Sequence, residues 1–531
     1  MLIERVIIDN YKSFEHFDLK FRDDVNIIVG DNEAGKSSIL EAINLALTGQ
    51  LYGRNVMTEI TPYLFNIQTI NKYIDGLKSG EKTELPTIRI ELYLNNGEDT
   101  VNLSGTNNSK RENTAGISLL IEFNEEYTDE YSNYIKSPDE IRTVPVEYYT
   151  VKWYSFANKL ITPRSIPLNV SLIDTSMLRM QNGTDQYISK IISDALELKE
   201  RVGMALDYRK LKEDFAERPA IKNINDKLAT KKGDLSEKNF TVSIDVTPRS
   251  NWESNLSSYL NDIPFQHSGK GEQSAVKMKL ALELKAQKAH LILIEEPENH
   301  LSFSSMNKLI DQISRKCTGK QLIITTHSTF VLNKMGLDKL ILIKNNIAMT
   351  LSDLKDETQK YFMKLPGYDT LRMVLAKKAI LVEGPSDELI VQKAYHKFYG
   401  KLPIEDGVDV IAVNALSFKR FLDIAKKLEL DVRVVTDNDG DLIKFNSKYD
   451  GYLTTDHIKI CYDKNIEYPT LEPQLLRCND LTVFNHIFNT KHKTDQEMLH
   501  YMGKNKTNCA MCLFETDENF NIPGYIHDAI K

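Results

Sequence analysis

VNIIVGDNEAGKSSILEAINLALT, residues 25–48, joins a strand-like apolar run to an amphipathic helix through a glycine-bearing loop. The run Val25–Val29 predicts a buried strand, and apolar residues at helical spacing predict a helix from Lys36 to about Leu47. The loop between them fits the pattern G-x-x-x-x-G-K-[ST] from Gly30 to Ser37. A strand, this loop and a helix in that order predict the opening of an α/β fold.

The loop has the composition of a phosphate-binding site. Its glycines let successive backbone N–H groups turn toward phosphates, and the helix N-terminus adds a positive dipole. In this pattern Lys36 bridges the β- and γ-phosphates and the Ser37 hydroxyl binds Mg²⁺. We therefore expect ATP as a cofactor, with these candidate binding residues in the loop: Gly30, Asn32, Gly35, Lys36, Ser37 and Ser38.

A later segment that ends in two acids could bind the Mg²⁺ of the same nucleotide. The apolar run Leu291–Ile294 ends in two carboxylates, so a sheet would deliver Glu295 toward the Mg²⁺ and Glu296 toward the attacking water. The segment SGKGEQ, which begins with Ser268 and Gly269, precedes an expected helix, and His327 follows an expected strand, 322–325. Together with the loop at residues 30–37, these segments make a chance match improbable.

The rest of the chain divides into recognisable stretches. Residues 2–8 predict a strand that belongs with residues 25–48 to the opening of the α/β fold. The alternating segment 87–94 and the strand-like segments 117–123 and 146–153 predict an antiparallel β-layer. Residues 172–237 carry helical spacing and many charges, which predicts a helical insertion. Strands and helices alternate from residue 268 to 343 as in a parallel sheet, and a second α/β unit follows from residue 379.

Composition excludes several classes of protein. With 41% hydrophobic and 27% charged residues in 531, the chain is too apolar for a mainly disordered protein, and five cysteines exclude a disulfide scaffold. No apolar run reaches 18 residues and the first segment is not a signal peptide, so we expect a cytoplasmic protein without membrane contact. The net charge of -8 argues against a uniformly basic surface but leaves a nucleic-acid partner open.

Two pairs of acids lie at expected strand ends near the C-terminus. Glu383 follows the run 379–382, and Asp387 lies four residues later in the first turn of the next helix. Asp437 and Asp439 follow the run 432–436, where the two-residue period of a strand would point both to one side. Parallel strands would bring the two pairs together.

Such convergence requires a cation. Carboxylates that share a pocket repel one another unless Mg²⁺ or Mn²⁺ neutralises them, and two such ions suit phosphodiester cleavage. An EF-hand is excluded because Leu442 stands where its glycine belongs and Lys448 where its glutamate belongs. A plain acidic surface turn is the alternative. Residues 371–531 carry 21 Lys and Arg against 24 Asp and Glu, so any path for DNA would be local or come from a partner subunit.

The nucleotide motifs resemble those of the ABC ATPases of the RecF, SMC and OLD kind. In that resemblance residues 30–37 are Walker A, residues 268–273 the signature, Glu295 and Glu296 belong to Walker B, and His327 is the switch histidine. Two heads of that family sandwich ATP, which implies a homodimer or higher homo-oligomer. The chain is too short for the long coiled-coil arm of SMC proteins.

The later acids resemble those of a Toprim domain, and an ABC ATPase followed by Toprim is the arrangement of the OLD (overcoming lysogenization defect) family. The resemblance implies an ATPase domain at 1–365, with a dimerising insertion at about 172–237, and a Rossmann-like Toprim domain at 372–531. It also implies that Glu472 joins Glu383, Asp387, Asp437 and Asp439 as a metal ligand. Lys506 would stabilise the charged transition state, with Lys504 as a possible substitute.

The function expected from this resemblance is that of a metal-dependent DNA endonuclease controlled by ATP. Such proteins are often antiphage effectors, with a helicase partner as in Gabija or with a reverse transcriptase and its RNA–DNA product as in retrons. The main alternative is a RecF- or SMC-like ATP-dependent DNA clamp with a non-cleaving Toprim scaffold. A topoisomerase or a primase needs a further domain, and no segment of this chain has the length for one. A nuclease that acts on RNA remains an open alternative.

Overall fold

The computed structural model describes residues 1–31, 33–81, 83–174, 180–181, 184–229, 242–243, 252, 256–350, 353–364, 368–413 and 417–531. These residues form two compact units, one of residues 1–2 and 164–324, the other of residues 3–163 and 325–531. Among the helices of the described residues, none combines the length and the apolarity needed to cross a bilayer.

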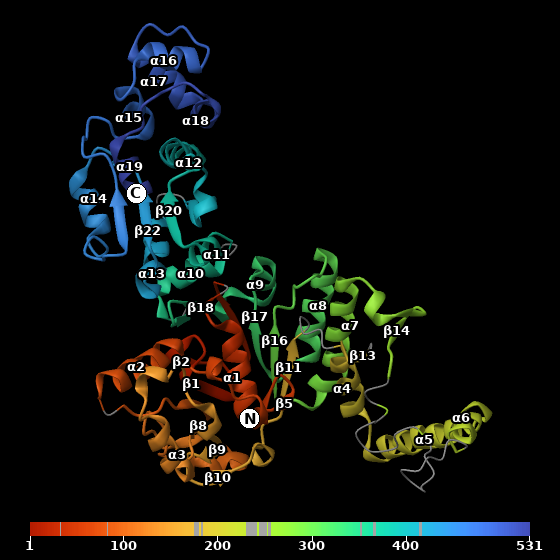
Figure 1. Ribbon diagram of the computed structural model, residues 1–531. Helices are drawn as coiled ribbons and strands as arrows, with labels where there is room; N and C mark the ends of the chain where they lie inside the picture. Colours follow the sequence, from red (N-terminus) through yellow and green to blue (C-terminus); the bar gives the residue numbers. More distant parts are fainter. Residues whose placement is uncertain are drawn as a thin grey trace. The chain divides into compact units, whose positions relative to one another are not determined.

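The second unit begins with an antiparallel sheet in the order β10-β9-β8-β6-β1-β2, with β7 paired to β8 (Figure 1). The strands are β1 (Ile3–Tyr11), β2 (Phe14–Lys20), β6 (Ile88–Leu94), β7 (Ser104–Gly105), β8 (Thr114–Phe123), β9 (Tyr149–Ser155) and β10 (Leu160–Ile161). This sheet confirms the expected antiparallel layer. One expected strand begins later than predicted, because Val146–Tyr148 after Pro145 forms a 3-10 turn before β9.

The same unit carries the phosphate-loop segment. Strand β3 (Val25–Gly30) pairs parallel with β18 (Leu340–Lys344), and β19 (Ile347–Thr350) returns antiparallel to β18. Helix α1 (Lys36–Thr48) follows the loop and buries its apolar residues, as the helical spacing predicts. It ends at Gly49, whose left-handed φ of 67° lets its N–H reach the Leu45 carbonyl. The short helix α9 (Thr329–Met335) precedes β18.

The C-terminal part of this unit is built on a four-stranded parallel sheet in the order β21-β20-β22-β23. Its strands are β20 (Lys378–Val382), β21 (Val408–Ala412), β22 (Val432–Val435) and β23 (Ile458–Cys461). Helices α12 (Pro385–Tyr399), α13 (Phe418–Leu428) and α19 (Gly524–Ile530) pack against it, and α14 (Leu442–Tyr449) follows β22. Four helices extend from the sheet (Figure 1): α15 (Leu471–Arg477), α16 (Leu481–Ile487), α17 (Asp495–Lys504) and α18 (Lys506–Glu515).

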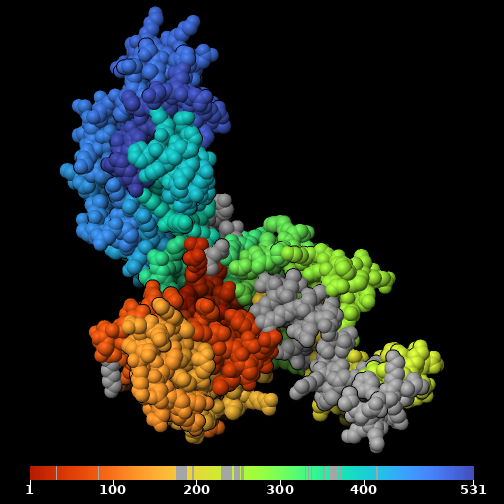
Figure 2. Space-filling view, viewed as in Figure 1, coloured from red at the N-terminus to blue at the C-terminus, as the bar shows by residue number. Residues whose placement is uncertain are grey.

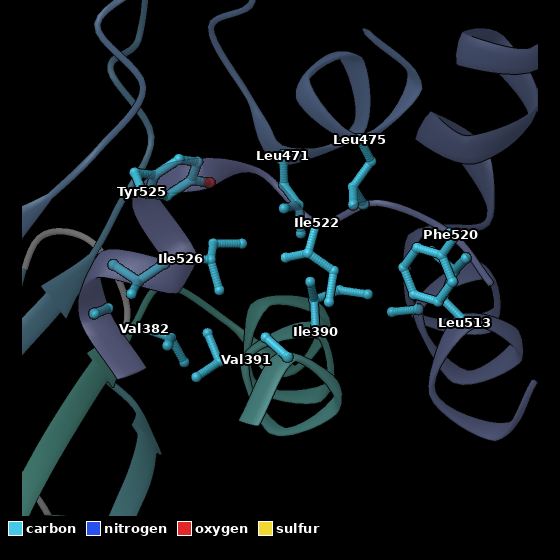
Figure 3. Close-up of a cluster of buried hydrophobic side chains, with 14 of the residues drawn as sticks. Val382, Ile390, Val391, Leu471, Leu475, Leu513, Phe520, Ile522, Tyr525 and Ile526 are labelled. Atoms are coloured by element: carbon cyan, nitrogen blue, oxygen red, sulfur yellow. The ribbon is translucent and has the colours of Figure 1, made fainter. Parts of the chain in front are cut away.

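A single apolar cluster holds these C-terminal helices on the sheet. Figure 3 shows Val382 of β20 and Ile390 and Val391 of α12 facing Leu471 and Leu475 of α15, with side chains of α18 and α19 beside them. Burial of side chains of this size stabilises the fold by about 1.5–3 kcal/mol each. The last 60 residues of the chain are therefore part of the core of this region and not an appendage.

The first unit contains the second acidic motif. Strand β11 (Val170–Asp174) pairs parallel with β16 (Leu291–Glu295), and all but the last residue of β17 (Gln321–Thr325) belongs to this unit. The helix expected after residues 268–273 begins within that segment, as α7 (Lys270–Leu280), and it continues through a π turn at Ala281–Lys285. Helix α8 (Phe303–Lys316) follows β16.

Three helices occupy the expected insertion: α4 (Gln186–Ala195), α5 (Leu198–Ala216) and α6 (Pro219–Ala229). The structure thus confirms a helical insertion within the described part of residues 172–237. Helix α5 exposes apolar side chains along its length, among them Leu198, Leu206 and Leu211, which are 53–77% exposed. Helices α5 and α6 are the yellow to yellow-green segment in the space-filling view (Figure 2).

Candidate functional site

The first acidic pair lies at the end of β20. The strand ends at Val382, Glu383 follows, and Gly384 precedes the Pro385 that begins α12. Asp387 therefore falls in the first turn of α12, where its Oδ2 accepts a hydrogen bond from the Gly384 N–H at 3.2 Å. The two carboxylates lie close enough for the Glu383 charge to raise the pKa of Asp387. This is the arrangement that the four-residue spacing predicts.

The second pair begins at the end of β22, the neighbour of β20. Glu383 Oε1 accepts hydrogen bonds from the Asp437 N–H at 2.9 Å and from the Thr436 hydroxyl at 2.5 Å, which ties the two strand ends together. The expected strand geometry does not extend to Asp439, because β22 ends at Val435 and Asp439 has a left-handed φ of 50°. Asp437 is half-buried and Asp439 is exposed.

Asp441 has a structural role in the same loop. Its Oδ1 accepts hydrogen bonds from the Ile443 and Lys444 N–H groups and so caps α14. The loop from 437 to 441 therefore divides its three aspartates between two tasks. Two remain available to a ligand, and one fixes the helix that follows.

Helices α15 and α18 contribute Glu472 and Lys506 to the same acidic group. Glu472 is buried in the first turn of α15, and the Lys506 ammonium lies 3.0 Å from its Oε1. Lys504, at the end of α17, is exposed, and no described residue is recorded as its ion-pair partner. The structure therefore favours Lys506 over Lys504 as the lysine that accompanies the acids. Burial lowers the pKa of Lys506, but the hydrogen bond and charge of Glu472, with smaller contributions from Asp437 and Asp387, outweigh it, so the pKa is raised.

The carboxylates destabilise one another's charged forms. Burial, then the charge of Glu383, raises the pKa of Asp387 to about 7. Burial and the charges of Glu383, Asp387, Glu472 and Asp439 raise the pKa of Asp437 to about 8. Desolvation and like charge both disfavour a carboxylate. The group therefore holds more negative charge than its surroundings neutralise.

The donors suit a hard divalent cation. Five carboxylates from three segments offer oxygen ligands alone, which Mg²⁺ and Mn²⁺ prefer. As the side chains stand, no three acidic, histidine or cysteine residues in the described ranges are arranged to hold an ion. In this arrangement Glu383 accepts a hydrogen bond from the Thr436 hydroxyl, and Glu472 is paired with Lys506. The donor set therefore fits such a cation by its chemistry.

The phosphate loop has the backbone that its glycines predict. Gly35 has φ 80°, and a Cβ there would lie 2.4 Å from Phe14 Cζ. A Cβ on Gly30 would lie 2.4 Å from the Ile343 carbonyl oxygen. The buried Lys36 ammonium donates to the Gly30 and Asp31 carbonyls at 3.1 and 2.9 Å, so it lies folded over its own loop. Ser37 is exposed and Ser38 half-buried, whereas Asn32 lies outside the described residues.

His327 lies beside the same strand as the loop. The Thr326 N–H donates to the Ile28 carbonyl of β3 at 3.1 Å, which brings the residue after it alongside the end of β3 that leads into the loop. Ser328 then caps α9 by accepting from the Val331 N–H. His327 therefore lies close in the fold to the strand that leads into the phosphate loop.

The first unit holds the other nucleotide candidates. Glu295 ends β16, and Glu296 has a left-handed φ of 39° and accepts from the Asn299 amide at 2.8 Å. Ser268 and Gly269 precede α7, and the buried Gln273 amide donates to the Ser268 carbonyl at 2.9 Å. A Cβ on Gly271 would lie 2.4 Å from the His300 carbonyl oxygen, so the turn after β16 and the start of α7 are in close contact.

Sequence reasoning missed the residues that support the acids. Asn438 is fully buried between Asp437 and Asp439, and its amide joins this loop to residues 463–465. Gln474 is equally buried, donates to the Tyr468 carbonyl and accepts from the Tyr525 hydroxyl. An isolated amide or tyrosine has no spacing pattern that marks such a role. Of the two cysteines of α18, Cys509 is buried and Cys512 is exposed, and neither forms a disulfide.

Two family models match the chain. The AAA domain matches residues 5–239, and the TOPRIM domain of the overcoming lysogenization defect protein-like kind matches residues 374–439. The second match covers Glu383, Asp387, Asp437 and Asp439 but ends before Glu472 and Lys506.

Curated relatives fall into two groups. The endonuclease GajA of Bacillus cereus (strain VD045) is 22% identical over 475 residues, 83% of this chain and 75% of GajA. The DNA double-strand break repair Rad50 ATPase of Methanopyrus kandleri is 50% identical over 46 residues, 9% of this chain, and the match spans only 5% of Rad50. The DNA replication and repair protein RecF of Bacillus mycoides is 44% identical over 43 residues, 8% of this chain and 12% of RecF.

Solved structures give weaker likenesses. An SMC head bound to the C-terminal winged-helix domain of ScpA has a TM-score of 0.36 at 16% identity and covers 66% of this chain and 99% of that one. RecF with ATP has a TM-score of 0.35 at 12% identity and covers 66% of this chain and 97% of RecF. At these TM-scores the likenesses add nothing to the assignment.

The strand orders, the phosphate loop and the two family models define the class, an ATPase head followed by a TOPRIM domain. The chain accordingly joins an AAA ATPase domain to a TOPRIM domain that is similar to that of overcoming lysogenization defect proteins, and over most of its length it is similar to the endonuclease GajA.

Proposed function

We propose that this protein is a DNA endonuclease that depends on a divalent metal and is regulated by ATP. The observation that carries the proposal is the group of carboxylates from three segments, with Lys506 beside it. Glu383, Asp387, Asp437, Asp439 and Glu472 are the proposed ligands of Mg²⁺ or Mn²⁺, in two sites. The name and 83% coverage of the endonuclease GajA support the same activity.

When bound, the ions would activate the attacking water and stabilise the leaving oxygen of the phosphodiester. The residues of the chain position the reaction. Thr436 and the Asp437 N–H hold Glu383 at the junction of two strands, and Glu472 keeps Lys506 at the edge of the acidic group. A lysine there would offer positive charge to the phosphoryl oxygens, which carry the negative charge of the transition state.

The nucleotide would bind through Gly30, Asn32, Gly35, Lys36, Ser37 and Ser38, with Glu295 completing the Mg²⁺ site and Glu296 orienting water for hydrolysis. Ser268, Gly269 and His327 are proposed to contact the nucleotide, with the signature contributed by a second copy. Lys36 now donates to two carbonyls of its own loop, and these bonds must open when its ammonium turns to phosphate. The proposed ATPase domain spans 1–365 and the TOPRIM domain 372–531.

The proposed assembly is a homodimer or higher homo-oligomer. The apolar side chains that α5 exposes support it, since a helix rarely leaves Leu198, Leu206 and Leu211 in water. Leu211→Glu should then lower the mass measured by light scattering, whereas Lys210→Glu should not. We place the protein in the cytoplasm as an antiphage effector, with a helicase or a reverse transcriptase and its RNA–DNA product as partner.

The second candidate function is an ATP-dependent DNA clamp whose TOPRIM half does not cleave. The short identities to Rad50 and RecF favour it, but they cover less than a tenth of the chain. Cleavage of supercoiled plasmid with Mg²⁺ or Mn²⁺, with and without ATP, separates the two. Wild type should cut and Asp437→Ala should not, while Lys36→Ala reveals whether ATP permits or restrains cutting. Absence of cutting by wild type together with its native partners would overturn the proposal.

A further inference from the structure

The acidic group is assembled from loops that are distant in the sequence, so some residue must set their separation. The loop 437–441 follows β22, and the loop 463–470 follows β23 and leads into Glu472 at the start of α15. Strand pairing between β22 and β23 stops at Val435 and Cys461, before either loop begins. Beyond that point side chains hold the loops together.

Asn438 makes the junction. Its Nδ2 donates to the Asp463 carbonyl at 2.8 Å and to the Asn465 carbonyl at 2.9 Å, while its Oδ1 accepts from the Gly440 N–H at 2.8 Å. The side chain is 0% exposed, so these bonds are made away from water. One amide therefore uses both its ends, one on each loop.

Further hydrogen bonds order the two loops that the Asn438 amide joins. The Oδ1 bond stabilises the left-handed turn at Asp439 and Gly440, whose φ values are 50° and 72°. Along the other loop, Asn465 N–H donates to Asp463 Oδ1 at 2.9 Å, and Gln474 holds the Tyr468 carbonyl at 2.9 Å. Thr470 then donates its hydroxyl to Glu472 Oε2 at 3.2 Å. Backbone bonds from the Tyr468 N–H to the Asn465 carbonyl and from the Gln474 N–H to the Thr470 carbonyl, both 3.3 Å, complete a hydrogen-bonded path from Asn438 to Glu472.

We propose that Asn438 is a positioning residue that fixes the distance between Asp437 and Asp439 on one loop and Glu472 on the other, so that they can share divalent cations. The proposal rests on the proposed function, because it assigns those acids to metal binding. Hydrogen-bonded residues behind metal ligands change metal affinity about 10- to 100-fold when they are removed. Loss of the Asn438 amide should act at that scale.

The chain offers a matched control. Asn479 also donates through its amide to two carbonyls, those of Leu475 at 2.7 Å and Asn521 at 2.8 Å, and accepts from the Asn521 N–H at 2.5 Å. It joins the end of α15 to the segment before α19 and touches none of the acids. Asn479→Ala removes the same number and kind of bonds as Asn438→Ala.

Mn²⁺ binding to the full chain, measured by electron paramagnetic resonance of free Mn²⁺, tests the proposal without requiring cleavage. We expect Asn438→Ala and the milder Asn438→Ser to weaken Mn²⁺ binding about 10-fold or more. Asn479→Ala should leave it within about twofold at a comparable loss of Tm. Plasmid cleavage by Asn438→Ser should recover at high Mn²⁺ with an unchanged KM for DNA.

The proposal would be overturned by unchanged Mn²⁺ affinity in folded Asn438→Ser or by an equal loss of affinity in Asn479→Ala. Wild type that binds no Mn²⁺ would overturn it as well. Wild type that binds Mn²⁺ in an Asn438-dependent manner but cuts no DNA would instead overturn the proposed function and leave the positioning role standing.

Discussion

Asp437→Asn should make the metal-free protein more stable while it abolishes cutting. Asp437 is half-buried beside four other carboxylates, and its pKa is raised from 3.8 to about 8. The folded protein therefore binds this proton more tightly than the unfolded chain, so the free energy of unfolding falls as pH rises from about 4 to about 8. Asparagine keeps the shape of the protonated side chain and cannot ionise.

The magnitude follows from the same pKa. Between 3.8 and a working pH of 7, each pH unit corresponds to about 1.4 kcal/mol, which gives an upper limit of about 4 kcal/mol. Water reaches part of this side chain and its neighbours can turn, which reduces the expected gain to about 1–2 kcal/mol. A gain of that size raises Tm by about 2–8 °C in a domain of this length.

Thermal unfolding in EDTA at pH 5, 7 and 8 measures the effect. The difference in Tm between Asp437→Asn and wild type should widen with pH, and Mn²⁺ should stabilise wild type but not the variant. Asp456→Asn, which changes an exposed carboxylate of the same region, should stay within about 0.5 kcal/mol of wild type. A variant that is less stable than wild type at pH 8, or a difference that does not change with pH, would refute the reasoning.

Two further predictions each compare a variant with a matched control of the same residue type. Lys506→Met should lower kcat about 100-fold or more and Lys504→Met should not, because only Lys506 lies against Glu472, and equal losses in plasmid-cleavage assays would contradict this. Gly35→Ala should abolish binding of a fluorescent ATP analogue, because its Cβ would meet Phe14 at 2.4 Å. Gly53→Ala has a similar φ of 75° with open space around it, and it should bind normally.

The sequence contains enough to predict the elements whose pattern is local. The phosphate loop, the antiparallel layer and the strand-helix-strand order around Glu383 follow from periodicity and glycine placement, and the structure has them. Strand β2 escaped prediction because its buried residues alternate only over Phe17 and Leu19, while Phe14 lies three residues before Phe17 and breaks the period. Asp439 shows the same limit, since a period-2 argument fails once the strand has ended at Val435.

The supporting residues of the acidic group lie beyond any local pattern. Asn438 and Gln474 matter because tertiary folding brings carbonyls of distant loops to their amides. A polar residue flanked by acids reads as one more exposed loop position until its burial is known. Composition gives no indication that these two amides are fully buried.

The proposed site also depends on the end of the chain. The TOPRIM model matches residues 374–439, which bring four acids, whereas Glu472, Lys506 and Tyr525 come from the helices that follow. Tyr525 of α19 donates to Gln474, and Gln474 holds the loop that leads to Glu472. Those helices share one apolar core with β20 and α12. The packing of the last 60 residues therefore holds the acids near one another against their mutual repulsion. A TOPRIM domain without these helices would keep Glu383, Asp387, Asp437 and Asp439 but would lack Glu472 and the packing that holds the segments together.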